Sequence, residues 1–146
     1  MQNLYNPLPL TEAQKLTYIS LLVFLAKADN NPEYIEREFV KKVISRFGLS
    51  TDSLQKLSVI KTIDDLPYIL QPIRERAVAL DLLHCLWFAA SVDGVISSDE
   101  TKIIRNVARI LNIGDDTMLM LNSFVMDEMN FLQQACDMLE TEEVAC

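Results

Sequence analysis

The chain has 146 residues, half of them apolar, and a formal net charge of −8 at neutral pH. This length suits one domain with one sizeable core, so we predict a single domain over residues 1–146. An acidic balance repels phosphate backbones and argues against nucleic-acid binding. The longest apolar runs have six residues, whereas a helix needs about 20 to cross a bilayer, so we expect no transmembrane segment.

The acidic charge is concentrated near the C-terminal end. Up to Arg109, 13 basic residues balance 13 acidic ones, but residues 110–146 carry eight acids and no Lys or Arg. Two interpretations are open for this acidic stretch. It is either a solvated face that keeps the protein in solution or a working surface for a protein partner.

Targeting and redox features predict a cytoplasmic protein. Residues 1–7 lack the positively charged region and apolar run of a secretory signal. Cys85, Cys136 and Cys146 are odd in number and lack the C-x-x-C spacing of zinc or redox sites. We therefore expect three reduced thiols, with Cys85 in the core.

The first half of the chain predicts two helices joined by a short turn. Thr11 and Glu12 form a helix start, and residues 16–28 are apolar on nearly every side, which is typical of a buried helix. Pro32 suits the first position of the next helix, whose apolar residues recur at 3.6-residue spacing as far as Phe47. Gly48 is its expected stop.

The middle of the chain predicts two short helical segments and a central helix. Residues 51–60 favour a short helix, and residues 64–67 begin another helical turn. Residues 73–92 become apolar on all sides, so we expect them to form the central and longest helix. No alternating pattern of a strand occurs, and only three glycines are present. An all-α fold is therefore expected.

The last third of the chain predicts an amphipathic helix and a Met-rich C-terminal segment. Ser97 and Glu100 have the S-x-x-E spacing of a capping box, and the helix that follows ends near residues 112–114. Residues 115–140 hold five of the six Met residues and predict one long or two short acidic helices. Such Met-rich faces either close a core or provide an adaptable partner surface.

Two segments of the chain align without a gap when the sequence is shifted by 64 positions. The shift places Asp29 on Asp93 and Glu36 on Glu100, and the flanking apolar positions also coincide. The copies cover about residues 16–49 and 80–113. Each copy therefore predicts an apolar helix, a tight acidic turn and an amphipathic helix.

Enzymatic chemistry is not favoured by any motif in the chain. His84 is the only histidine, and no nucleophile elbow, phosphate loop or dinucleotide fingerprint is present. Asp81 and His84 resemble half of a di-iron motif, but a second histidine does not exist. We therefore predict a non-enzymatic protein in which His84 is a core or boundary residue hydrogen-bonded to Asp81.

The acidic turn at residues 93–100 matches only half of an EF-hand loop. Asp93, Gly94 and Glu100 occupy acceptable positions, but Ala89 and Ser91 stand where the first two calcium ligands are required. Turn chemistry and the helix dipole alone also favour an Asp ending one helix and a Glu opening the next. Capping and cation binding therefore both remain open for these acids.

The repeated turn resembles the TerB-like family, the helical domain associated with tellurite resistance. The resemblance lies in residues 89–100, which read Ala-Ala-Ser-Val-Asp-Gly-Val-Ile-Ser-Ser-Asp-Glu, and more weakly in residues 26–36. It implies about seven helices with internal pseudo-twofold symmetry and a stress-response module that binds protein partners. It further implies that Asp93, Glu100, Asp29 and Glu36 bind a divalent cation such as Ca²⁺, Mg²⁺ or Mn²⁺. Residues 30–32 depart from the family pattern, which weakens the first copy as a cation site.

Two functional hypotheses follow from these observations. The first is a non-enzymatic TerB-like module, associated with stress response and tellurite resistance, that binds a divalent cation through its acidic turns. The second is a metal-independent adaptor or regulatory domain that uses the acidic, Met-rich surface of residues 115–140. An enzyme that uses His84 is the least favoured class.

Overall fold

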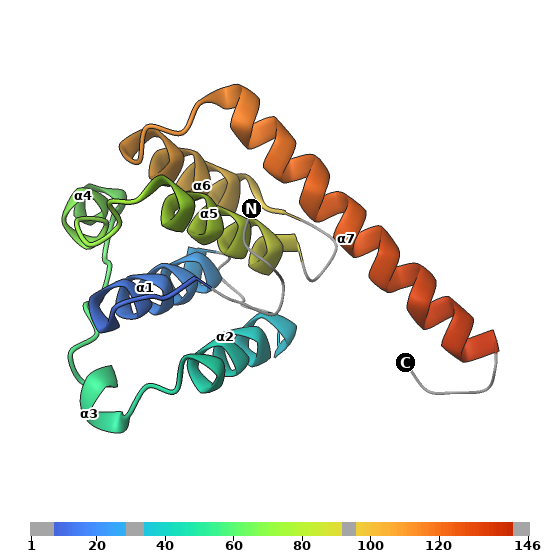
Figure 1. Cartoon of the computed structure of the whole chain (residues 1–146), viewed down its shortest axis with the longest axis horizontal. Coiled ribbons are helices and arrows are strands. Elements are labelled where there is room, and N and C mark those ends of the chain that lie inside the picture. The colour runs from blue at the N-terminus through green and yellow to red at the C-terminus, as the bar shows by residue number, and fades with distance from the viewer. Residues whose placement is uncertain (1–7, 29–33, 92–95, 142–146) are drawn as a thin grey trace.

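The computed structural model describes the backbone of residues 8–28, 34–91 and 96–141, and the side chains there except those of residues 34–37, 39, 140 and 141. These ranges contain seven α-helices and one short 3-10 helix (Figure 1). They are α1 (Glu12–Ala28), α2 (Tyr34–Phe47), α3 (Thr51–Leu54), η1 (Ile63–Asp65), α4 (Leu66–Ile69), α5 (Arg76–Ser91), α6 (Ser98–Ile110) and α7 (Asp115–Thr141). The described ranges contain no strand, which confirms the all-α class.

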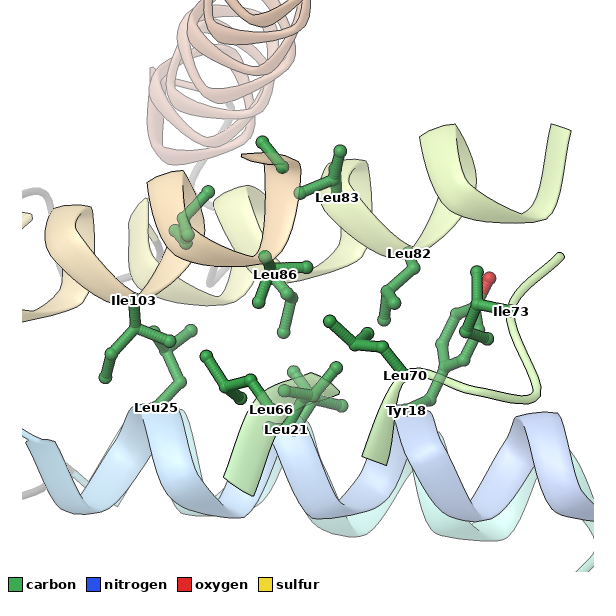
Figure 2. Close-up of a cluster of buried hydrophobic side chains, with 14 of the residues drawn as sticks. Tyr18, Leu21, Leu25, Leu66, Leu70, Ile73, Leu82, Leu83, Leu86 and Ile103 are labelled. Atoms are coloured by element: carbon green, nitrogen blue, oxygen red, sulfur yellow. The ribbon is translucent and has the colours of Figure 1, made fainter. Parts of the chain in front are cut away.

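The centre of the fold is formed by α1 and α5, the two helices that are apolar on most sides. α2 packs on α1, α6 packs on both central helices, and α7 packs on α5 (Figure 1). Figure 2 shows side chains from α1, α4, α5 and α6 converging on one core. Leu21, Leu66 and Leu86 have no solvent exposure there. Burying each such side chain contributes roughly 1.5 to 3 kcal/mol to the stability of the fold.

Reciprocal side-chain caps fix where α1 and α6 begin. At the start of α1, the Gln14 backbone N–H donates to Thr11 Oγ1 at 3.1 Å, and the Thr11 N–H donates to Gln14 Oε1 at 3.0 Å. Ser97 and Glu100 form the same reciprocal pair at the start of α6, as predicted. Each capping box satisfies two backbone donors that the first helical turn leaves unpaired.

A residue with left-handed backbone conformation follows the second helix of each copy. Gly48 has φ of 65° and Asn112 has φ of 61°, and the two lie 64 positions apart. After α6, the Ile113 N–H donates to the Ala108 carbonyl at 2.9 Å and the Asn112 N–H donates to the Arg109 carbonyl at 3.1 Å. This pair of hydrogen bonds forms a Schellman motif, in which glycine or asparagine takes the position with left-handed backbone conformation.

The helix pairs recur at the predicted spacing. α1 and α5 begin 64 positions apart, and so do α2 and α6. The turns that join each pair, residues 29–33 and 92–95, lie outside the described residues. A pseudo-twofold relation between the two pairs stays a prediction.

Two sequence-based expectations about the helices are wrong. The segment at residues 51–60 is helical only over α3, because the chain then turns inward and buries Ile60 in the core. The longest helix is α7, with 27 residues, and not the central helix α5, with 16. α7 contains no glycine or proline to interrupt it.

The thiol prediction also needs correction. Cys136 is disulfide-bonded in the structure, so the expectation of three reduced thiols is wrong. Cys85 is a free thiol at the boundary of the core, and burial raises its pKa to about 12. Among the described helices, none is long and apolar enough to span a bilayer.

Candidate functional site on the α5–α7 face

The structure places only one of the four predicted cation ligands in full. Asp29 and Asp93 lie outside the described residues, and the side chain of Glu36 in α2 does so as well. Glu100 is described and is 1% exposed. Within the described ranges, no three His, Cys, Asp or Glu side chains gather as a group that could hold a metal ion.

The position of Glu100 gives it a structural role at the start of α6. Its Oε1 accepts a hydrogen bond from the Ser97 backbone N–H at 3.0 Å, and its own N–H donates to Ser97 Oγ at 3.1 Å. A carboxylate in the first helical turn is also stabilised by the helix dipole. The capping interpretation is therefore confirmed for Glu100, and cation binding stays a prediction.

Two short polar contacts join α5 to α7. His84 Nε2 lies 2.6 Å from Glu128 Oε1, and Trp87 Nε1–H donates to Asn122 Oδ1 at 2.6 Å. Between these contacts in the sequence of α7, Val125 is fully buried. We call this contact between the two helices the α5–α7 seam, and it determines how α7 lies on the fold.

The predicted hydrogen bond between His84 and Asp81 is wrong. Asp81 Oδ2 instead accepts a hydrogen bond from the Tyr18 hydroxyl of α1 at 2.7 Å. Burial, together with the neighbouring Asp81 carboxylate, raises the pKa of Tyr18 above its ordinary value. Residues three apart share a helix face only approximately, so Asp81 contacts α1 while His84 contacts α7.

An aromatic cluster lies beside the His84 end of the seam. The rings of His84 and Phe124 are 5.5 Å apart in an edge-on arrangement, and the rings of His84 and Phe88 are 6.4 Å apart. Edge-on aromatic pairs at such distances are favourable. The imidazole is therefore held by an acid on one helix and by aromatic rings from both.

An open groove of about 500 Å³ continues from this cluster. Its lining comes from one residue of α5 and five of α7, and we call it the α5–α7 groove: Phe88, Phe124, Asp127, Glu128, Phe131 and Leu132. Phe131 is 69% exposed even though it is a large apolar side chain. The groove therefore combines apolar walls with two carboxylates.

The exposed apolar surface extends beyond the groove along α7. The C-terminal half of α7 projects past the other helices (Figure 1). Met120, Phe124, Phe131 and Met138 are exposed, and their spacings of four and seven residues put them on one face of the helix. Leu119 and Met126 are also exposed, but they lie roughly 120° around the helix from this face, and we call that part of α7 its opposite side. Sequence reasoning identified this segment as Met-rich but did not locate the groove or the projecting face.

The comparison with family models decides the family. The model for the tellurite resistance protein TerB matches residues 15–121, which is most of the chain. The chain belongs to the TerB family. No curated protein and no solved structure gives a match.

The match confirms the resemblance seen in the sequence and identifies a module associated with tellurite resistance. It begins at Lys15, inside α1, covers α2 to α6 in full and ends at Leu121, inside α7. The α7 side of the groove, which begins at Phe124, therefore lies beyond the part of the chain that matches TerB.

Proposed function

We propose that this TerB-family chain is a non-enzymatic interaction module that recognises a protein partner through the exposed apolar face of α7. The observation that carries the proposal is the solvent exposure of Phe124, Phe131 and Met138 along one face of a projecting helix. Contiguous exposed apolar surface on a folded protein marks an interaction site. A role in stress response is part of the proposal and is supported by the family.

The arrangement of α7 supports recognition more than core closure. The side of α7 that faces α5 is already packed, with Val125 buried and Asn122 bonded to Trp87. The exposed face is a second apolar surface on the same helix. Each large apolar side chain on it would contribute roughly 1.5 to 3 kcal/mol when a partner buries it.

A pair of matched double variants tests this proposal. Phe131→Ser with Leu132→Ser changes the groove side of α7, whereas Leu119→Ser with Met126→Ser changes the opposite side. All four side chains are exposed, so both proteins are expected to fold. We expect the groove-side variant to lose a partner that the wild-type chain and the opposite-side variant both capture. Equal capture by all three proteins would refute the proposal.

The second candidate function is divalent-cation binding by the acidic turns. The observation that favours it is the burial of the Glu100 carboxylate in the first turn of α6. Carboxylate oxygens are ligands that suit Ca²⁺, Mg²⁺ or Mn²⁺. Asp93 and Glu100 form the stronger candidate, and Asp29 and Glu36 form the weaker one.

Titration of the metal-free chain with each cation tests this candidate. Backbone amide shifts are followed for the wild type and for Glu100→Gln, which keeps the side-chain oxygen that caps Ser97. Cation binding predicts saturable shifts around Asp93 and Glu100 that the variant loses. No response of the four acids at millimolar metal would remove the cation function.

A further inference from the structure

We propose that the α5–α7 groove binds a basic amphipathic helix of the partner protein. This inference rests on the proposed function, because it names the chemistry of the partner that the α7 face recognises. It is carried by the shape of the groove, the spacing of its apolar residues and its charge.

The shape of the groove suits a helix better than an extended chain. Its walls come from two helices that contact each other at the seam, and the described ranges place no sheet edge beside it. Phe124, Phe131 and Met138 are spaced seven residues apart along the exposed face. A seven-residue apolar repeat is the pattern that packs against a second helix.

The flexibility of the methionine side chains on the exposed face of α7, beside the groove, fits a helical partner of varied sequence. Met120 and Met138 flank the aromatic residues on the same face of α7, and both are exposed. Methionine is unbranched and adapts its shape to different apolar partners. The groove therefore selects a partner helix by the width of its apolar stripe rather than by the identity of one side chain.

The charge of the groove selects a basic partner. Asp127 and Glu128 are part of its lining, and residues 110–146 contain no Lys or Arg. Asp127 makes no hydrogen bond or ion pair with any described residue. Among the described residues of the seam, the basic side chain is that of His84, which is already in contact with Glu128. Lysines or arginines beside the partner's apolar stripe would pair with these acids and favour association.

The same charge argues against a second copy of this chain as the occupant. Two α7 helices placed face to face would bring carboxylates together without any basic residue of α7 to offset them. Like charges juxtaposed across an interface oppose association. Anionic surfaces such as nucleic acids and acidic membranes are repelled for the same reason.

Three synthetic helical peptides test the inference on the full chain. All three carry leucine on one face, and the other face carries lysine, glutamate or glutamine. Affinity is measured by calorimetry and by the fluorescence of Trp87, the only tryptophan. We expect the Leu/Lys peptide to bind at least about tenfold more tightly than the Leu/Glu peptide at low salt, and added salt to reduce the difference.

Matched variants locate the binding site. Phe131→Ala is expected to weaken the affinity for the Leu/Lys peptide by about tenfold or more, because a large aromatic side chain at the centre of an interface is a typical hot spot. Leu119→Ala, on the opposite side of α7, is expected to leave its affinity unchanged. Asp127→Asn is expected to weaken binding about two- to fivefold and to reduce its salt dependence, whereas Asp137→Asn, away from the groove, is not.

Each alternative outcome overturns the inference in a recognisable way. Equal binding of all three peptides, still sensitive to Phe131→Ala, would keep the docking surface of the proposed function and refute the basic partner. No binding of any peptide would refute the inference, and the double variants described above would then decide the proposed function separately. Self-association of the chain that Phe131→Ala abolishes would assign the groove to a second copy.

Discussion

The contact between Trp87 and Asn122 offers a sharp test of how α7 is held on the fold. Asn122→Ala removes the acceptor of the indole N–H at 2.6 Å and leaves Val125 and the His84–Glu128 contact in place. We expect the variant to lower the free energy of unfolding. The donor that is left behind lies in a partly buried position, where the loss of a partner is costly.

The magnitude of this loss follows from the contact and from a matched control. An intramolecular hydrogen bond contributes about 0.5 to 1.5 kcal/mol, and an unsatisfied partner adds to that loss. Asn130→Ala is the control, because Asn130 is exposed on the same helix and gains the same helix propensity from alanine. We therefore expect Asn122→Ala to be less stable than Asn130→Ala by about 1 to 1.5 kcal/mol, or roughly 3 to 5 °C in melting temperature.

Denaturant unfolding followed by Trp87 fluorescence and by circular dichroism measures this difference. The single tryptophan reports on the seam, whereas circular dichroism reports on all helices. Equal midpoints for Asn122→Ala and Asn130→Ala would show that the Trp87 contact does not hold α7, and the reasoning about the seam would fail.

Three further predictions concern the core and the helix ends. Burial raises the pKa of both Tyr18 and Cys85, so the stability that their neutral forms provide is fully present below their unfolded-state pKa values, near 10 and 8.5, and is lost as the pH rises above them. We expect the denaturant midpoint to fall between pH 8 and 11, and Tyr18→Phe to make this fall with pH less steep. An equally steep fall in Tyr18→Phe would contradict the burial argument. Ser97→Ala is expected to cost about 1 kcal/mol of unfolding free energy, because it breaks a capping box; Ser98→Ala, at an exposed neighbour, is the control, and similar losses for both would count against the cap. Gly48→Ala is expected to cost about 1 kcal/mol although a Cβ at Gly48 meets nothing within 4 Å, because φ is +65° there; Ser45→Ala, one turn earlier in α2, is the comparison, and a neutral Gly48→Ala would show that the helix end relaxes.

The sequence predicted the helix pairs well because their signals are local. Apolar periodicity, the Ser97–Glu100 cap and the stop at Gly48 each depend on residues within one or two turns. The matching start positions of α1 and α5, and of α2 and α6, follow from the same 64-residue repeat. Local chemistry repeated in the sequence therefore accounts for helix starts at the same spacing.

The long-range features could not be predicted in the same way. His84 contacts Glu128, which is 44 positions away, and not the nearby Asp81. Periodicity showed that residues 115–140 were apolar, but it could not show which face α5 covers or that the helix extends past the bundle. The groove depends on this tertiary placement, and so only its composition was visible in the sequence.

The measurement that tests the central claim most directly is a methionine methyl spectrum of the full chain titrated with the Leu/Lys peptide. Met120 and Met138 share the exposed face with Phe131, whereas Met126 lies on the opposite side of α7. We predict saturable shifts for the methyl groups of Met120 and Met138 and an unchanged signal for Met126. Shifts confined to Met126, or spread equally over all three, would contradict the claim that this face of α7 is the recognition surface.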